Sequence, residues 1–172
     1  TGMGFDARVK GAGLREKVLD FGVSGLLYNS DVLMYDRQTE SLWSQIDRQA
    51  ISGPMKGAVL NTLPIEHTTW GDWYKRYPDS KVLSFDTGHA KNYRSSPYAG
   101  YENSEALYFP VSHQDKRYHP KEITLGLEVN GVFKAYPFSE LGKASSPLRD
   151  TVNGMQLKIH FNMETLDCII FF

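Results

Sequence analysis

Short runs of apolar, β-branched and aromatic residues alternate along the chain with turn-forming residues, a pattern typical of strands. Too little helix-like sequence separates most of the runs for repeated strand–helix–strand crossovers, so the pattern predicts antiparallel pairing. We expect a mainly β, β-rich α+β fold, arranged as an antiparallel barrel or sandwich. The predicted strands are Phe5–Val9, Val18–Val23, Val32–Asp36, Ser41–Ile46, Ala58–Leu63, Lys81–Phe85, Ala106–Phe109, Ile123–Val129, Val132–Tyr136, Met155–Phe161 and Leu166–Phe172.

Two tight hairpins are predicted from turn chemistry. Asn130-Gly131 and Asn153-Gly154 each lie between strand-like runs, and both residue types adopt the positive φ angles that such turns need. One clear short helix is expected near residues 69–77, with Thr68 or Thr69 as its N-cap and Pro78 ending it. Residues 138–141 could add one more helical turn.

Composition excludes several classes of partner. Lysine and arginine, 19 in all, nearly balance 20 aspartates and glutamates, so no net field attracts nucleic acid. No apolar run is long enough to span a bilayer. Because no linker divides the chain, we expect a single domain over residues 1–172. Its bare, strand-like C-terminal end and its start without methionine indicate a fragment of a longer protein.

Residues 29–45, here called the polar block, concentrate the candidate chemistry. Asp31, Asp36 and Glu40 could act as acid and base, while Arg37 could hold an anionic group. The alternative is structural, because residues 36–39 have the composition of a hairpin turn. Asn29, Ser30, Trp43 and Gln45 are the candidate ligand-binding residues of this block.

Near the C-terminus, His160, Met163 and Cys168 combine imidazole, thioether and thiol, a donor set that suits copper. Cys168 would have to return on the strand after His160 to meet it. The alternative is that Cys168 and Met163 only pack in the core. Copper is therefore a candidate cofactor, and no other cofactor is indicated.

Residues 87–103, here called the tyrosine loop, show no periodicity and are rich in Gly, Ser, Asn and Tyr. Tyr98 and Tyr101 in this loop are candidate ligand-binding residues, because tyrosine rings provide contact area and a hydroxyl at low entropic cost. Sugars or peptides would suit such a surface. Alternatively, the rings fold back over the end of the sheet as a lid.

Residues 21–45, FGVSGLLYNSDVLMYDRQTESLWSQ, resemble the signature block of the bacterial family known as domain of unknown function 3179. Further matching motifs lie along nearly the whole chain, at Gly53-Pro54, Thr69–Trp73, Tyr98, Tyr101, Lys121-Glu122, Leu125-Gly126 and Ala135–Pro137. The resemblance brings no established activity. Members often look exported, so it implies a periplasmic or extracellular location.

Family members usually begin with an additional segment that ends in a Cys-Pro-Leu-Cys motif, and this segment is missing ahead of Thr1. The sequence from Leu125 onwards resembles a second copy of it. A fold of two related halves, the first of them truncated here, is therefore one interpretation of the resemblance.

The leading functional hypothesis is a binding domain of the bacterial envelope that has no catalytic activity. It would use the polar block and the tyrosine loop to bind a small molecule, a sugar or a protein. The alternatives are a hydrolase that works through Asp31, Asp36, Arg37 and Glu40, and a copper-binding protein that uses His160, Met163 and Cys168.

Overall fold

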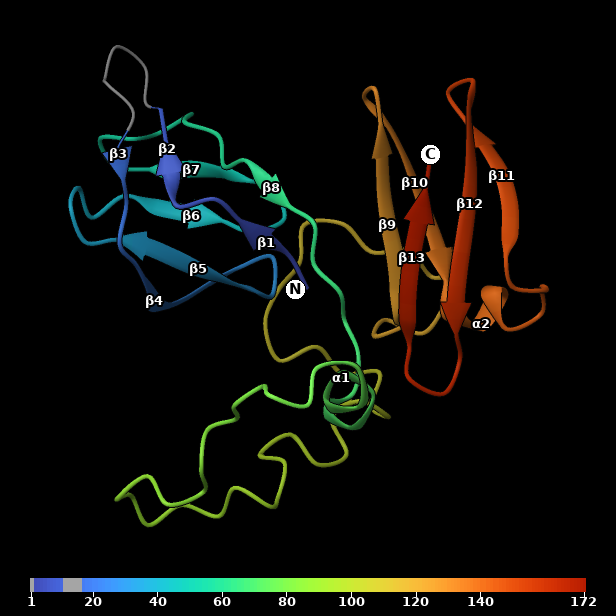
Figure 1. Ribbon diagram of the computed structural model, residues 1–172. Helices are drawn as coiled ribbons and strands as arrows, with labels where there is room; N and C mark the ends of the chain where they lie inside the picture. Colours follow the sequence, from blue (N-terminus) through green and yellow to red (C-terminus); the bar gives the residue numbers. More distant parts are fainter. Residues whose placement is uncertain (1, 11–16) are drawn as a thin grey trace. The chain divides into compact units, whose positions relative to one another are not determined.

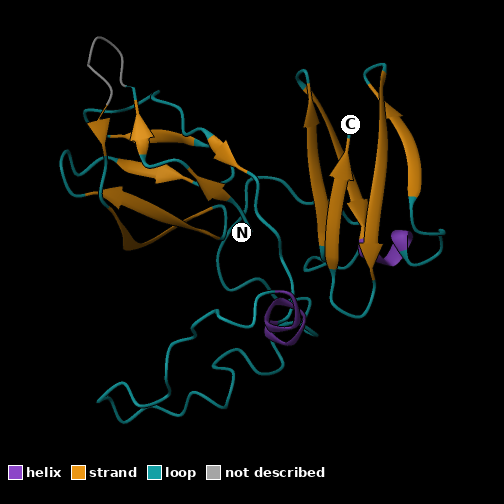
Figure 2. Ribbon diagram, viewed as in Figure 1, coloured by secondary structure: helices purple, strands orange, loops and turns teal. Residues whose placement is uncertain are grey.

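The computed structural model of the protein describes residues 2–10 and 17–172 (Figure 1). As predicted, the chain is mainly β with short helices, and its paired strands are antiparallel (Figure 2). The sheets stay open, and none of the described strands closes one into a barrel. The chain forms two compact units. The N-terminal unit comprises Thr1–Ile65 and Leu107–Gln114, and the C-terminal unit comprises Glu66–Ala106 and Asp115–Phe172. The single domain over residues 1–172 stays a prediction.

A four-stranded meander forms the main sheet of the N-terminal unit. Its strands follow one another in chain order: β4 (Phe21–Tyr28), β5 (Asp31–Asp36), β6 (Leu42–Ser44) and β7 (Gln49–Ser52). Asn29 and Ser30, which join β4 to β5, have φ angles of 50° and 61°. Two positive φ angles are typical of a two-residue type I′ turn. Two short pairs accompany this sheet, β1 (Gly4–Phe5) with β8 (Thr62–Leu63), and β2 (Arg8–Val9) with β3 (Lys17–Val18).

Trp43, on β6, is the largest fully buried side chain of the N-terminal core. The ring of Phe21 meets it edge-to-face, with 5.6 Å between the ring centroids. Small and aliphatic side chains fill the space around the indole, namely Val9, Leu19, Ala50, Met55, Ala58 and Leu60. A single tryptophan therefore joins side chains from both ends of this unit into one core.

The C-terminal unit places a two-stranded hairpin against a three-stranded sheet. The hairpin consists of β9 (Thr124–Val129) and β10 (Val132–Pro137), and the sheet of β11 (Leu148–Val152), β12 (Met155–Asn162) and β13 (Asp167–Phe171). Side chains of both layers make up the core between them, and α2 (Phe138–Leu141) adds Phe138 and Leu141 to it. This is an open, sandwich-like arrangement. Both predicted Asn-Gly hairpins are confirmed, because all four turn residues have positive φ angles.

The helix α1 (Trp70–Arg76) matches its predicted position. Thr69 is the N-cap, and its Oγ1 accepts a hydrogen bond from the backbone N–H of Asp72 at 3.2 Å. The helix ends at Tyr77, immediately before Pro78. None of its residues is buried, and the exposed rings of Trp70 and Tyr74 stack on each other instead.

Two of the predicted strands are wrong, and one real strand escaped prediction. Lys81–Phe85 and Ala106–Phe109 form no strand, although their side chains are strand-like. Leu83 is 94% exposed, so nothing in the described structure covers this segment to make a strand favourable. β7 was missed because Gln49 hides the apolar alternation of this short strand. β11 is the first strand of the hairpin predicted at Asn153-Gly154.

A polar contact joins the two layers of the C-terminal unit. Lys134 and Tyr136, two residues apart on β10, both donate to Oδ2 of Asp150 on β11, and the distance from the Tyr136 hydroxyl is 2.8 Å. The hydrogen bond from Lys134 lowers the pKa of Asp150 despite partial burial. Burial and the neighbouring Asp150 raise the pKa of Tyr136. The buried phenol is therefore a neutral donor to a charged acceptor.

We expect Asp150→Ala to lower the free energy of unfolding by about 1–3 kcal/mol, because the buried Tyr136 hydroxyl loses its acceptor. Tyr136→Phe should cost less, since it removes the donor without leaving a buried polar atom unpaired. Urea denaturation of both variants at pH 7 measures the difference. Equal losses in the two variants would contradict this account.

Candidate functional site

The carboxylate of Asp36 is the centre of the polar block. Asp36 ends β5 and is 0% exposed. Its Oδ1 accepts the backbone N–H of Thr39 at 2.6 Å, and its Oδ2 accepts the Thr39 hydroxyl at 2.7 Å and the Trp43 indole N–H at 2.9 Å. Burial by itself would raise the pKa of Asp36, but the hydrogen bonds from Trp43 and Thr39 outweigh it, and the pKa is lowered. Asp36 is thus a buried, ionised acceptor with three donors.

Ser41 continues this network into the following loop. Its hydroxyl lies 2.7 Å from the Thr39 hydroxyl and accepts the backbone N–H of Met55 at 2.9 Å. A Cβ placed on Gly53 would lie only 2.7 Å from the Ser41 Cα, and Gly53 has a φ of 88°. Glycine is therefore required at this position both for space and for backbone conformation. The network has a structural role throughout.

Of the other three candidate catalytic residues, only Asp31 is distant from Asp36; Arg37 and Glu40 follow Asp36 in the same turn, but they are exposed whereas Asp36 is buried. Asp31 begins β5, five residues before Asp36, which corresponds to about 17 Å along the strand and to opposite faces of the sheet. Arg37 is exposed, and its guanidinium donates to the Tyr35 hydroxyl at 3.0 Å. Glu40 is exposed in the turn with a φ of 56°. The structure does not bring Asp31, Asp36, Arg37 and Glu40 together around one reacting group.

The candidate ligand-binding residues of the polar block bind the protein's own backbone or core. Oδ1 of Asn29 accepts both the backbone N–H and the hydroxyl of Ser112, each at 2.8 Å. Ser30 donates to the carbonyl of Phe109 at 2.8 Å, and the amide of Gln45 donates to the carbonyl of Val32 at 2.9 Å. Trp43 is buried as described. Asn29 and Ser30 thus hold a peptide segment, but it is residues 109–112 of this chain.

Strand register separates the candidate copper ligands. His160 lies opposite Ile169, whereas Cys168 lies opposite Phe161, so imidazole and thiol point to opposite faces of the sheet. Cys168 packs in the core, where burial and then Asp167 raise the pKa of its thiol to about 11. Met163 packs against Gly142 beyond α2. Among the described residues, no group of three or more His, Cys, Asp and Glu side chains is placed to hold a metal ion.

The tyrosine loop presents its rings to solvent. Tyr98 is 62% exposed, and its ring centroid lies 6.5 Å from that of Tyr101. Tyr93 is also exposed, lies 6.4 Å from the ring of Phe85, and shares a 2.8 Å hydrogen bond with Thr87. One ring pair therefore lies within the loop, and the other joins the loop to Phe85 just before it. Such exposure favours the recognition surface over the lid.

A lysine outside all of the predicted sites holds the far end of this loop. The ammonium of Lys121 donates to three backbone carbonyls, those of Tyr101 at 2.6 Å, Ala106 at 2.7 Å, and Ser104. It also lies 3.6 Å from the centroid of the Tyr101 ring, within cation–π range. The end of the loop is thus fixed by one charged side chain. The only sequence signal was the place of Lys121 in the Lys121-Glu122 motif.

The family comparison covers both compact units. A family model described as "Protein of unknown function (DUF3179)" matches residues 1–169, which confirms the resemblance seen in the sequence. No curated protein and no solved structure matches the chain. In the described residues, no helix combines the length and the apolar character needed to cross a bilayer.

We expect Asp36→Asn to lower the free energy of unfolding by about 2–3 kcal/mol at pH 7, because an amide nitrogen would then face donors. The pKa of Asp36 is lowered on folding, so its contribution is complete above the unfolded value of about 3.9 and is lost as the pH falls through the folded value. Urea denaturation between pH 7 and pH 3 should show the gap between wild type and variant narrowing below about pH 4. Glu40→Gln is the matched control and should change little. A gap that stays constant down to pH 3 would refute the assignment.

Lys121→Met keeps the length of the side chain but removes the three charged hydrogen bonds to the loop. We expect chymotrypsin to cleave the tyrosine loop at least about tenfold faster in this variant, because local opening becomes easier. Mass spectrometry of the early fragments locates the cuts, and Lys116→Met controls for the loss of a lysine. Unchanged cleavage rates at Tyr93 and Tyr98 would show that Lys121 does not hold the loop.

Proposed function

The chain belongs to the family described as Protein of unknown function (DUF3179), and we propose that it is a non-catalytic binding domain of the bacterial envelope that recognises carbohydrate through its tyrosine loop. A periplasmic or extracellular location is part of this proposal, and its support is the exported character of the family members that the sequence resembles. The ligand would be a sugar polymer or a sugar-bearing protein of that compartment.

The observation that carries the proposal is the combination of exposed rings and a held loop end. The exposed rings are those of Phe85, Tyr93 and Tyr98, beside the partly buried Tyr101. Monomeric proteins rarely expose neighbouring large apolar side chains without a binding role. Because Lys121 fixes the loop at Tyr101, Ser104 and Ala106, less conformational entropy is lost when a ligand binds.

Carbohydrate suits this surface because tyrosine offers an apolar ring face and a polar hydroxyl together. The C–H faces of a sugar ring can pack on the phenol, while the sugar hydroxyls pair with the tyrosine hydroxyl and with the Ser and Asn side chains of the loop. Asn92, Ser95, Ser96 and Asn103 supply such groups around Tyr93 and Tyr98. The Tyr, Ser, Gly and Asn content of the loop matches that of adaptable recognition loops in general.

The arrangement of the polar block argues against the alternative of a hydrolase. Its most buried carboxylate, that of Asp36, already accepts three hydrogen bonds. Asp31 lies at the opposite end of β5, and Glu40 is exposed in the turn after Asp36. General acid–base catalysis needs two groups within reach of one substrate. The separation of His160 from Cys168 on opposite faces of the sheet likewise argues against a copper site.

Co-sedimentation with purified peptidoglycan and with chitin, an insoluble sugar polymer, tests the proposal. We expect the wild-type protein to pellet with at least one polymer, and Tyr93→Ala/Tyr98→Ala to bind roughly tenfold more weakly, because removing a contacting aromatic ring commonly costs more than about 1 kcal/mol. Tyr28→Ala, which removes an exposed tyrosine from the N-terminal unit, is the matched control.

Failure of the wild-type protein to pellet with either polymer would contradict carbohydrate binding. Equal pelleting of the wild type and the double variant would show that the tyrosine loop is not the binding surface.

A further inference from the structure

The sheet of β11, β12 and β13 has one face in the core and one face outside it. Leu148, Val152, Leu157, Ile159, Cys168 and Ile170 belong to the core clusters. Since side chains alternate along a strand, the outer face carries Arg149 and Thr151 on β11, Gln156 and Lys158 on β12, and Ile169 and Phe171 on β13. Apart from Lys158, which is partly buried, these six side chains are exposed.

Two cations lie directly opposite each other on this outer face. Arg149 pairs with Lys158 across β11 and β12. Opposed side chains in an antiparallel pair lie close together, and like charges in this arrangement destabilise a sheet. Neither residue forms an ion pair with any described residue of the chain. Within the part of the chain that the structure describes, this pair of cations on one small surface is therefore not neutralised by an ion pair.

Nearby carboxylates do not neutralise these cations. Asp150, their neighbour in sequence, is directed between the layers, where its Oδ2 is bound by Lys134 and Tyr136. Asp167 shares the outer face but lies four residues before Phe171 on β13, about 14 Å along the strand. An anion supplied from outside the chain is the simplest source of compensating charge.

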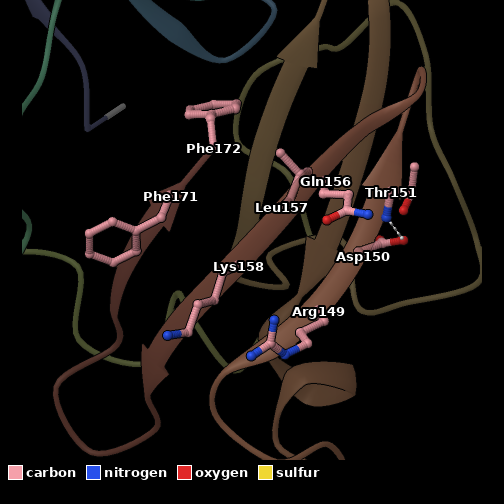
Figure 3. A pocket seen from close by; sticks show the side chains of 8 residues that line it. All are labelled: Arg149, Asp150, Thr151, Gln156, Leu157, Lys158, Phe171 and Phe172. Atoms are coloured by element: carbon pink, nitrogen blue, oxygen red, sulfur yellow. Dashed lines mark hydrogen bonds between the residues drawn. The ribbon is translucent and has the colours of Figure 1, made fainter.

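Two exposed aromatic side chains, those of Phe171 and Phe172, lie beside the cations. Lys158 has Arg149 opposite it on β11 and Phe171 opposite it on β13, so the three side chains form one row across the sheet. Phe171 and Phe172 are 53% and 73% exposed, and the edge of the His160 ring contacts Phe171 with 5.4 Å between ring centroids. Arg149, Lys158, Phe171 and Phe172 line a hollow of about 460 Å³ together with Thr151 and Gln156, and Asp150 and Leu157 complete its wall (Figure 3).

We propose that this hollow binds a small organic anion in which a phosphate or carboxylate group is attached to a flat apolar body. The anionic group lies between Arg149 and Lys158, where the guanidinium can donate two parallel hydrogen bonds. The apolar body packs on Phe171 and Phe172, and Thr151 and Gln156 offer hydrogen bonds to polar substituents. The site contains no residue of the tyrosine loop, so it is independent of carbohydrate binding there.

Titration of the isotope-labelled protein with phenyl phosphate, benzoate and the uncharged benzyl alcohol, followed by NMR, tests this site. We expect phenyl phosphate or benzoate to shift the amide signals of residues 149–151, 156–158 and 171–172 selectively, and benzyl alcohol to bind at least about fivefold more weakly. The two anions distinguish a phosphate ligand from a carboxylate ligand. Equal shifts by benzyl alcohol, or shifts centred on other residues, would overturn the proposal.

Variants separate binding from folding. Arg149→Gln and Lys158→Gln should each weaken the tighter anion at least about fivefold, whereas Lys56→Gln, an exposed lysine of the N-terminal unit, should not. Because each of the two substitutions removes a repulsion, the melting temperature should stay the same or rise. Unchanged anion affinity, or a lowered melting temperature in Lys158→Gln, would show that the cations serve the fold and not a ligand.

Discussion

The buried carboxylate of Asp36 ties the turn after β5 to the core of the N-terminal unit. A charged group without water is stable only if donors replace its hydration. Here Thr39 supplies two donors and Trp43 a third, so the geometry of the turn and the position of the indole are set together. Trp43 in turn orders the small side chains around it. The packing around Trp43 in this unit therefore depends on the two carboxylate oxygens of Asp36.

This dependence explains why the buried polar groups of the polar block have little hydrogen-bonding capacity left for a substrate. Hydrogen-bonding capacity that could have served a substrate is consumed in satisfying buried backbone and side-chain atoms, as at Ser41 and Gln45. Surfaces that lack internal partners are better candidates for function. The cation pair on β11 and β12 is such a surface, and the exposed rings of the tyrosine loop are a second candidate; both lie in the C-terminal unit.

Features set by neighbouring residues could be predicted from the sequence. The Asn-Gly hairpins and the Thr69 cap follow from local backbone chemistry, and both appear where expected. Features that depend on a strand or side chain distant in the sequence could not be predicted. Lys81–Phe85 has strand-like side chains but no neighbouring strand. A hairpin could bring His160 and Cys168 onto adjacent strands, as expected from the sequence. Only the strand register shows that their side chains point to opposite faces of the sheet. The row of Arg149, Lys158 and Phe171 likewise exists only once three strands are aligned.

The turn at Asn153-Gly154 has a consequence for how the protein avoids misfolding. Slipping β12 by one residue against β11 would invert every side chain of the slipped strand, moving Lys158 inward and Ile159 outward. An ammonium would then lose its water inside an apolar layer, and a fully buried isoleucine would become exposed. The positive charge of Lys158 repels Arg149 in the native register, but it would destabilise the shifted register much more. Lys158 therefore helps to specify the native pairing of β11 and β12.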